Sequence, residues 1–224
     1  MTTTDTILPD GMIFIGQDEY FDPVKHQYWK AGRQLPSFSW VMRACGLVSD
    51  YGSNFAMKRG VNVHRACELF VKGTLDWKSL DTALAGYLEA FQRACEELGF
   101  VPDLDACERP MINPVYLFGV KPDMSGWFAC QNDPKLQHGV LELKSVNSPS
   151  AFTKIVKYQT AAQALTLYPS TYLTARRVTV QLRPDGTYAK EEYEDMDDFD
   201  NFLALLKSAM IRLEAGLVKL NEEE

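Results

Sequence analysis

Residues 139–145 read GVLELKS, a short apolar stretch that is interrupted by two charged residues. Side chains alternate between the two faces of a β-strand, so Glu142 and Lys144 share one face while Leu141 and Leu143 share the other. The stretch is apolar enough to be a central strand, where burying an acid and a base is costly unless each has a partner. An exposed edge strand with a surface ion pair is the alternative.

Asp123 stands 19 residues before Glu142, in the sequence GVKPD at residues 119–123. It precedes a strand expected over 124–130 and can project from the end of that strand. If this strand and the one carrying Glu142 are neighbours, the two carboxylates converge. Two oxygen ligands with open coordination positions suit Mg²⁺ or Mn²⁺. A surface residue in a turn is the alternative interpretation of Asp123.

Two helical stretches carry polar residues that can join this site. His64 and Glu68 lie at positions i and i+4 of one helix and share a face, so they can supply a third metal ligand and a carboxylate that orients phosphate. Gln159 and Gln163 lie one turn apart on another helix, within or beside its apolar stripe. Neutral amides can bond phosphate oxygens or steady a nearby lysine. For both pairs, an ordinary hydrogen bond at the surface or the core rim is the alternative.

Hydrophobic periodicity, caps and turns predict mixed α and β structure in one domain of 224 residues. We divide it into an N-terminal hairpin and helical region (about 1–100), a β-sheet core with the metal site (about 101–195) and a C-terminal helix (about 196–224). The expected helices cover about 37–46, 54–72, 80–98, 148–168 and 196–220. The expected strands cover about 18–21, 26–30, 124–130, 139–146, 171–182 and 187–193, with turns at 22–25, 132–134 and 183–186.

Charge is distributed unevenly along the chain. The 23 basic and 30 acidic residues give a net charge of −7, yet residues 185–200 alone hold eight acidic residues and one basic residue. Between Lys135 and Arg183 there are seven basic residues and a single acidic one, Glu142. This basic excess would offset the cost of bringing DNA phosphates to an acidic metal site. We interpret the acidic segment 185–200 as a solvated loop and helix start, in preference to a surface that repels DNA.

The five cysteines form no CxxC pair, which predicts small buried side chains and no zinc ribbon or disulfide framework. The N-terminal residues MTTTDTILPDGMIF lack the pattern of a secretory signal, and no apolar run reaches the ~18 residues of a membrane span. We therefore expect a cytoplasmic protein without a membrane partner.

Taken together, the motifs resemble the PD-(D/E)XK nuclease superfamily and, within it, the RecB-like and phage exonuclease branch. The resemblance covers about residues 20–183 and rests on GxxxHxxxE at 60–68, Glu108, GxxPD at 119–123, ELK at 142–144 and YQxxxQ at 158–163. FDPxxHxY at 21–28 and LPS at 35–37 are similar to lead-in segments of phage members. Family members often carry Tyr where Gln163 stands, which leaves the role of that position open.

The resemblance implies an α/β fold with a restriction-endonuclease-like core, in which helices flank a central mixed β-sheet, plus a helical N-terminal region. It implies Mg²⁺ or Mn²⁺ held by His64, Asp123, Glu142 and the backbone carbonyl of Leu143, and no iron–sulfur cluster. Lys144 would position or polarise the attacking water, so that Lys144, Glu142, Asp123 and Gln159 form the catalytic set. The further residues are an accessory Glu108 and, for substrate binding, Glu68, Gln163, Lys154 and Lys157.

The leading functional hypothesis is a metal-dependent DNA nuclease, an exonuclease in phage-type recombination or DNA processing. Its partners would be linear DNA with ends and a single-strand annealing protein, in the host cytoplasm if a phage encodes it. The alternatives are a structure-specific endonuclease and a catalytically inactive module that binds nucleic acid or protein. The sequence leaves open the polarity of digestion, strand preference, DNA versus RNA and oligomeric state.

Overall fold

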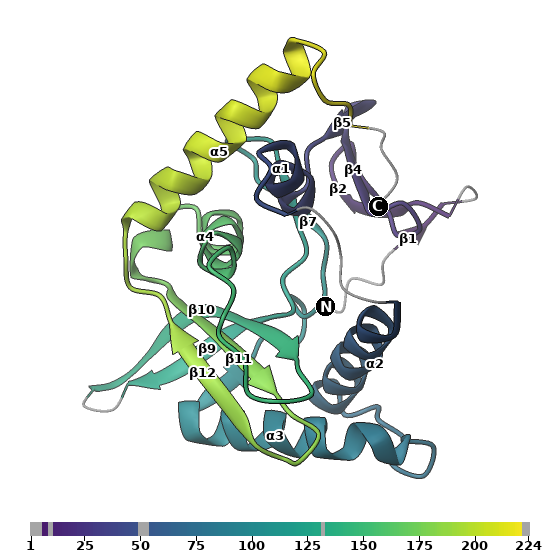
Figure 1. Cartoon of the computed structure of the whole chain (residues 1–224), viewed down its shortest axis with the longest axis vertical. Helices are drawn as coiled ribbons and strands as arrows, with labels where there is room; N and C mark the ends of the chain where they lie inside the picture. Colours follow the sequence, from purple (N-terminus) through teal and green to yellow (C-terminus); the bar gives the residue numbers. More distant parts are fainter. Residues whose placement is uncertain (1–5, 9–10, 49–53, 131–132, 221–224) are drawn as a thin grey trace.

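The computed structural model describes residues 6–8, 11–48, 54–130 and 133–220 (Figure 1). The helices are α1 (Phe38–Ala44), α2 (Asn54–Val71), α3 (Thr82–Leu98), α4 (Val156–Leu167) and α5 (Asp197–Glu214), with a 3₁₀ turn at Tyr172–Thr174. The strands are β1 (Thr6–Ile7), β2 (Ile13–Gly16), β3 (Glu19–Asp22), β4 (Gln27–Lys30), β5 (Arg33–Leu35), β6 (Phe100–Pro102), β7 (Met111–Ile112), β8 (Gly119–Val120), β9 (Met124–Cys130), β10 (Asp133–Ser145), β11 (Arg176–Leu182) and β12 (Tyr188–Glu192).

A five-stranded mixed sheet forms the centre of the fold, in the order β12-β11-β10-β9-β6. Strands β10 and β11 run parallel, and the other neighbours run antiparallel. Figure 1 shows α3 and α4 on opposite sides of this sheet. The predicted α/β fold, with helices flanking a central mixed sheet, is confirmed.

Strand β10 contains the GVLELKS stretch and lies between β9 and β11. Leu141 and Leu143 are fully buried in the core that α3 builds on one face of the sheet, together with Phe91. By alternation, Glu142 and Lys144 lie on the opposite face, toward α4. The edge-strand alternative is therefore wrong, and the charged pair occupies the middle of the sheet.

The N-terminal elements follow the local signals in the sequence. Strands β1 to β5 form a second, antiparallel sheet that includes the expected strand pair around the turn at 22–25. Helix α1 is capped by Ser37, whose Oγ accepts the N–H of Trp40 at 3.1 Å. Helix α3 starts at the Asp81 cap and ends at Gly99, which adopts a left-handed φ of +56°.

Three elements differ from their predicted limits. Helix α4 begins at Val156, without a side-chain cap, and residues 150–153 ahead of it line a cavity and form no helical turn. Strand β11 begins at Arg176, since the 3₁₀ turn takes up residues 172–174. Helix α5 ends at Glu214, because Gly216 adopts a left-handed φ of +70° and donates its N–H to Leu213.

The expected turn at 132–134 is the fourth difference. Asn132 lies outside the described residues, and strand β10 already begins at Asp133. Strand β10 is therefore longer than the strand that the apolar run at 139–146 predicted.

The acidic segment 185–200 is not solvated throughout. Asp198 is fully buried, where it pairs with Arg177 at 3.0 Å and with Lys157 at 2.9 Å. The solvated interpretation is thus wrong for Asp198, because the first turn of α5 packs against the start of β11 and α4. Arg177, counted in the basic tract, is 1% exposed and belongs to the core.

Among the described residues, no helix has the length and apolar character that crossing a bilayer requires.

Gly86 provides a test of how closely α3 packs on the β11–β12 hairpin. A Cβ built there would lie 1.8 Å from the carbonyl oxygen of Pro184, which is backbone and cannot rotate away. We expect Gly86→Ala to lower the free energy of unfolding by roughly 1–3 kcal/mol, because overpacking outweighs the gain in helix propensity. Urea denaturation measures this difference.

Gly60 on α2 is the matched control. Its added Cβ would meet only Ser145 Oγ, at an ordinary 3.7 Å. Gly60→Ala should keep or raise the stability, by up to about 1 kcal/mol, since alanine favours the helix. Equal stability changes in the two variants would contradict the packing at Gly86.

Candidate metal centre

Strands β9 and β10 bring Asp123 and Glu142 together, as the sequence led us to expect. The strands pair antiparallel with Met124 opposite Leu141, so Asp123, directly before β9, lies beside the Glu142–Leu143 segment. Asp123 is buried, and its Oδ2 accepts the backbone N–H of Leu143 at 2.7 Å. This bond fixes the carboxylate and leaves Oδ1 directed at α2.

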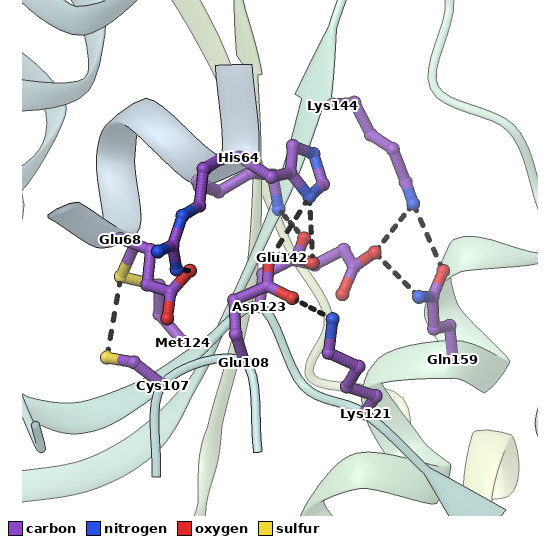
Figure 2. Close-up of polar contacts among 12 residues, drawn as sticks. His64, Glu68, Cys107, Glu108, Lys121, Asp123, Met124, Glu142, Lys144 and Gln159 are labelled. Carbon is purple, nitrogen blue, oxygen red and sulfur yellow. Dashed lines mark hydrogen bonds and ion pairs between the residues drawn. The ribbon is translucent and has the colours of Figure 1, made fainter. Parts of the chain in front are cut away.

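His64 on α2 completes a compact group with Asp123 and Glu108 (Figure 2). Its Nδ1 lies 3.0 Å from Asp123 Oδ1 and 3.6 Å from Glu108 Oε1. One ligand atom from each of the three residues lies within 4.8 Å of the others, so this group can hold a metal ion. One imidazole nitrogen and two carboxylate oxygens are a donor set that suits divalent metals such as Mn²⁺.

Glu108 is held in place by the loop that carries it. Its backbone N–H donates to the carbonyls of both Pro122 and Asp123, each at 3.1 Å. Its φ of +53° is uncommon for a residue with a side chain. Residues in such conformations persist where their surroundings fix them, and they cluster at functional sites. The structure thus moves Glu108 from an accessory position to a member of the central group.

Positive charges balance the carboxylates of the site. Lys121 Nζ lies 2.5 Å from Glu108 Oε2. Burial lowers the pKa of His64, but the carboxylates of Asp123 and Glu108 outweigh it and raise the pKa to about 10. Burial raises the pKa of Asp123, but His64 and Lys144 outweigh it, so the pKa lies below its ordinary value. His64 therefore carries the positive charge that a bound metal ion would replace.

Glu142 anchors a second polar network on the same side of the sheet. Lys144 Nζ donates to Glu142 Oε1 at 2.6 Å and to Gln159 Oε1 at 3.2 Å, and Gln159 Nε2 donates to Glu142 Oε1 at 2.6 Å. Gln163 Nε2 donates to Glu142 Oε2 at 2.7 Å. Figure 2 shows Lys144 and Gln159 meeting at the Glu142 carboxylate, beside the His64 group.

Electrostatics in this network favours a charged Lys144. Burial lowers the pKa of Lys144, but the carboxylates of Glu142 and Asp123 outweigh it and raise the pKa above its ordinary value. Burial and the neighbouring Asp123 carboxylate raise the pKa of Glu142, against the opposing effects of Lys144 and Gln163. The site therefore places a fixed ammonium beside the group that can hold a metal.

The predicted metal ligands fall into two sets. His64 and Asp123 belong to the three-residue group, whereas the Glu142 carboxylate is occupied by Lys144 and the two glutamine amides. Leu143 contacts Asp123 through its N–H. That Glu142 and the Leu143 carbonyl ligate a metal stays a prediction.

A cavity of about 900 Å³ joins these residues. Of the residues predicted for the site, the cavity lining includes His64, Glu68, Glu108, Asp123, Glu142, Leu143, Lys144, Gln159 and Gln163. Glu68 forms ion pairs with Arg65 at 2.6 Å and Lys72 at 2.7 Å. Burial raises its pKa, but these two cations outweigh the effect and lower it.

Lys154 and Lys157 do not line this cavity. Lys154 lies in the turn ahead of α4, and Lys157 Nζ lies 2.9 Å from Asp198 Oδ1 on the α5 side. The structure does not bring them to the group of His64, Glu108 and Asp123.

Among the polar residues of the cavity lining that sequence reasoning missed are Lys121 and Gln181. Lys121 lies within the GVKPD motif, two residues before Asp123, and its position next to a carboxylate was the available signal. Gln181 lies on β11, where a polar residue alternates with Val180 and Leu182 as Glu142 does with its leucines. That alternation was the signal for Gln181.

Comparisons with known proteins assign no family to this chain. No family model matches it, and no curated protein matches it. A solved structure from Eubacterium rectale, named "Putative exonuclease", is similar to this chain with a TM-score of 0.46 and 12% sequence identity. The alignment covers 84% of this chain and 79% of that protein's chain. At this level of similarity, the functional argument rests on the geometry of the site.

Proposed function

We propose that the protein is a divalent-metal-dependent deoxyribonuclease that hydrolyses phosphodiester bonds, with Mg²⁺ or Mn²⁺ as its metal. The observation that carries this proposal is the juxtaposition of two groups in one cavity. The ligand atoms of His64, Glu108 and Asp123 lie within 4.8 Å of one another, and the Lys144 ammonium forms an ion pair with the neighbouring Glu142 carboxylate. A module that only binds has no physical need for this cluster of charges, in which Asp123 and Glu142 are buried and the others are partly buried.

Each residue has a chemical part in this proposal. His64, Glu108 and Asp123 would hold the metal, with Glu142 as a further ligand. The metal would act as a Lewis acid on the phosphate and would lower the pKa of a water molecule. Lys144 would stabilise negative charge on the phosphate in the transition state. Gln159, which contacts both Lys144 and Glu142, would hold the ammonium in position.

We further propose that the enzyme degrades DNA from its ends, in recombination or DNA processing of the phage type, alongside a single-strand annealing protein. This finer assignment is supported by the order of the sequence motifs, including His64 in GxxxH at 60–64. Val61 on α2 and His26 in the turn between β3 and β4 line the cavity together with the proposed metal ligands. These residues would form one wall of the cavity, next to the end of a bound DNA strand.

An assay with end-labelled linear DNA and covalently closed circles tests this function. With Mg²⁺ or Mn²⁺, linear DNA should shorten progressively while closed circles survive, and EDTA should stop the reaction. The rate should fall steeply as salt rises, because phosphate contacts are screened and counterion release is weakened.

The same assay separates the alternatives. Rapid nicking or linearisation of closed circles would favour the endonuclease. DNA binding without cleavage in either metal would favour the inactive binding module.

A further inference from the structure

Two buried side-chain oxygens beside the metal centre lack a hydrogen-bond donor. Gln163 Oε1 and Gln181 Oε1 receive no hydrogen bond from any residue that the structure describes. The two side chains are only 2% and 3% exposed, and both line the cavity. Buried polar atoms are almost always paired, and leaving one unpaired costs folding free energy. The two oxygens therefore indicate a missing partner.

The orientation of Gln163 is fixed by its other amide atom. Its Nε2 donates to Glu142 Oε2 at 2.7 Å, and a carboxylate accepts only from the NH₂ end of the amide. A flipped amide would place two acceptors against each other. Gln163 Oε1 is therefore an acceptor that faces away from Glu142.

Gln181 lies next to Lys144. The two residues are partners in the parallel pair of β10 and β11. Val180 and Leu182 pack in the core on the α3 side, so alternation directs Gln181 to the α4 side, where Lys144 and Gln163 also lie. The side chains that carry the two unpaired oxygens thus lie on the same side of the sheet as the Glu142–Lys144 network, one on α4 and the other on β11.

The chemistry of these atoms selects the partner. Both oxygens are acceptors, so a phosphate anion cannot satisfy them, whereas water donates two hydrogen bonds. The Lys144 ammonium has three protons, and two of them are directed to Glu142 and Gln159. A buried water needs two to four polar partners, and two carboxamide oxygens with one ammonium proton meet that need.

We propose that Gln163 and Gln181 hold a buried water beside the Lys144 ammonium, and that Gln181 is a positioning residue for hydrolysis. The water accepts the third proton of Lys144 and donates to the two glutamines, which keeps the ammonium directed at Glu142. Gln181 acts through this water and touches no reacting atom. The positioning role rests on the proposed nuclease function, whereas the water site does not.

A crystal structure of the metal-free wild-type protein tests the water site directly. We expect a water within hydrogen-bonding distance of Gln163 Oε1 and Gln181 Oε1, and its loss in Gln181→Met. Absence of density there in the wild type would overturn the proposal. An anomalous peak between the two oxygens after soaking with Mn²⁺ would also overturn it, because the oxygens would then be metal ligands.

Single-turnover cleavage of linear DNA tests the positioning role. Gln181→Met should lower the maximal rate about tenfold, the effect of one lost hydrogen bond, while KM and Mn²⁺ affinity stay unchanged. In a Gln163→Met background, the same change should alter the rate less than about twofold, because the shared water is already lost. Gln137→Met is the matched control, since Gln137 bonds Thr174 outside the cavity.

The outcomes separate the two proposals. A wild-type protein that cleaves no DNA refutes the nuclease function, and the crystal structure still decides the water site. Gln181→Met with reduced stability and an unchanged rate would show that the water is structural, which overturns the positioning role.

Discussion

Asp123→Asn is expected to lower DNA cleavage by at least about 10³-fold and to abolish Mn²⁺ binding by the folded protein. The change removes one of the two carboxylates in the group with His64, and a metal contributes several kcal/mol to stabilising the transition state. The new amide oxygen can still accept the N–H of Leu143, which the Asp123 carboxylate now accepts at 2.7 Å. Calorimetric Mn²⁺ titration and single-turnover cleavage measure the two effects, and circular dichroism checks the fold.

Two further variants separate metal binding from catalysis. Lys144→Met should retain Mn²⁺ binding and lower the rate about 10²-fold, as expected for one lost charge-stabilising group. Asp105→Asn is the control, because Asp105 is exposed and lies outside the cavity lining. Unchanged Mn²⁺ affinity in Asp123→Asn would refute the metal centre.

Arg177→Met is expected to lower the free energy of unfolding by about 3 kcal/mol, the lower end of the cost of breaking a buried ion pair, because Asp198 loses the guanidinium but keeps its ion pair with Lys157. Arg177 donates to Asp198 Oδ2 at 3.0 Å, to Lys157 O at 3.1 Å and to Asp195 O at 2.7 Å. Its guanidinium also lies 4.7 Å from the centre of the Phe199 ring. Guanidinium chloride denaturation of both proteins measures the loss.

The double variant Arg177→Met/Asp198→Asn identifies the cause. It should be more stable than Arg177→Met alone, because the buried carboxylate without its guanidinium has been removed. A loss of less than about 1 kcal/mol in Arg177→Met would contradict a central role for this ion pair.

Local signals in the sequence are sufficient for several elements of the fold. The caps Ser37 and Asp81 and the left-handed Gly99 set the limits of α1 and α3 close to the predicted ranges, because each acts on backbone groups within a few residues. The alternation in GVLELKS likewise predicted which side chains of β10 share a face. Such signals fail where packing competes with them, as at α4, whose predicted first turn lines the cavity instead.

The sequence was also sufficient to predict most residues of the candidate site and their chemical character. His64, Asp123, Glu142, Lys144 and Gln159 were all singled out there, and the structure gathers them around one cavity. The sequence could not show that Glu108 lies in the same group as His64 and Asp123, because its position there depends on backbone hydrogen bonds to Pro122 and Asp123.

Only the tertiary structure distinguished charges that serve the cavity from charges that hold the core together. In the sequence, Arg177 belongs to the basic tract and Asp198 to the acidic segment that we interpreted as solvated. In the structure, the two residues form a buried ion pair between β11 and α5. Gln181 became part of the site through its pairing with Lys144 across two strands. A sequence determines which groups are available and which faces they occupy within one element. Burial and partners depend on contacts between distant segments, and these set the free energy of each charged or polar group.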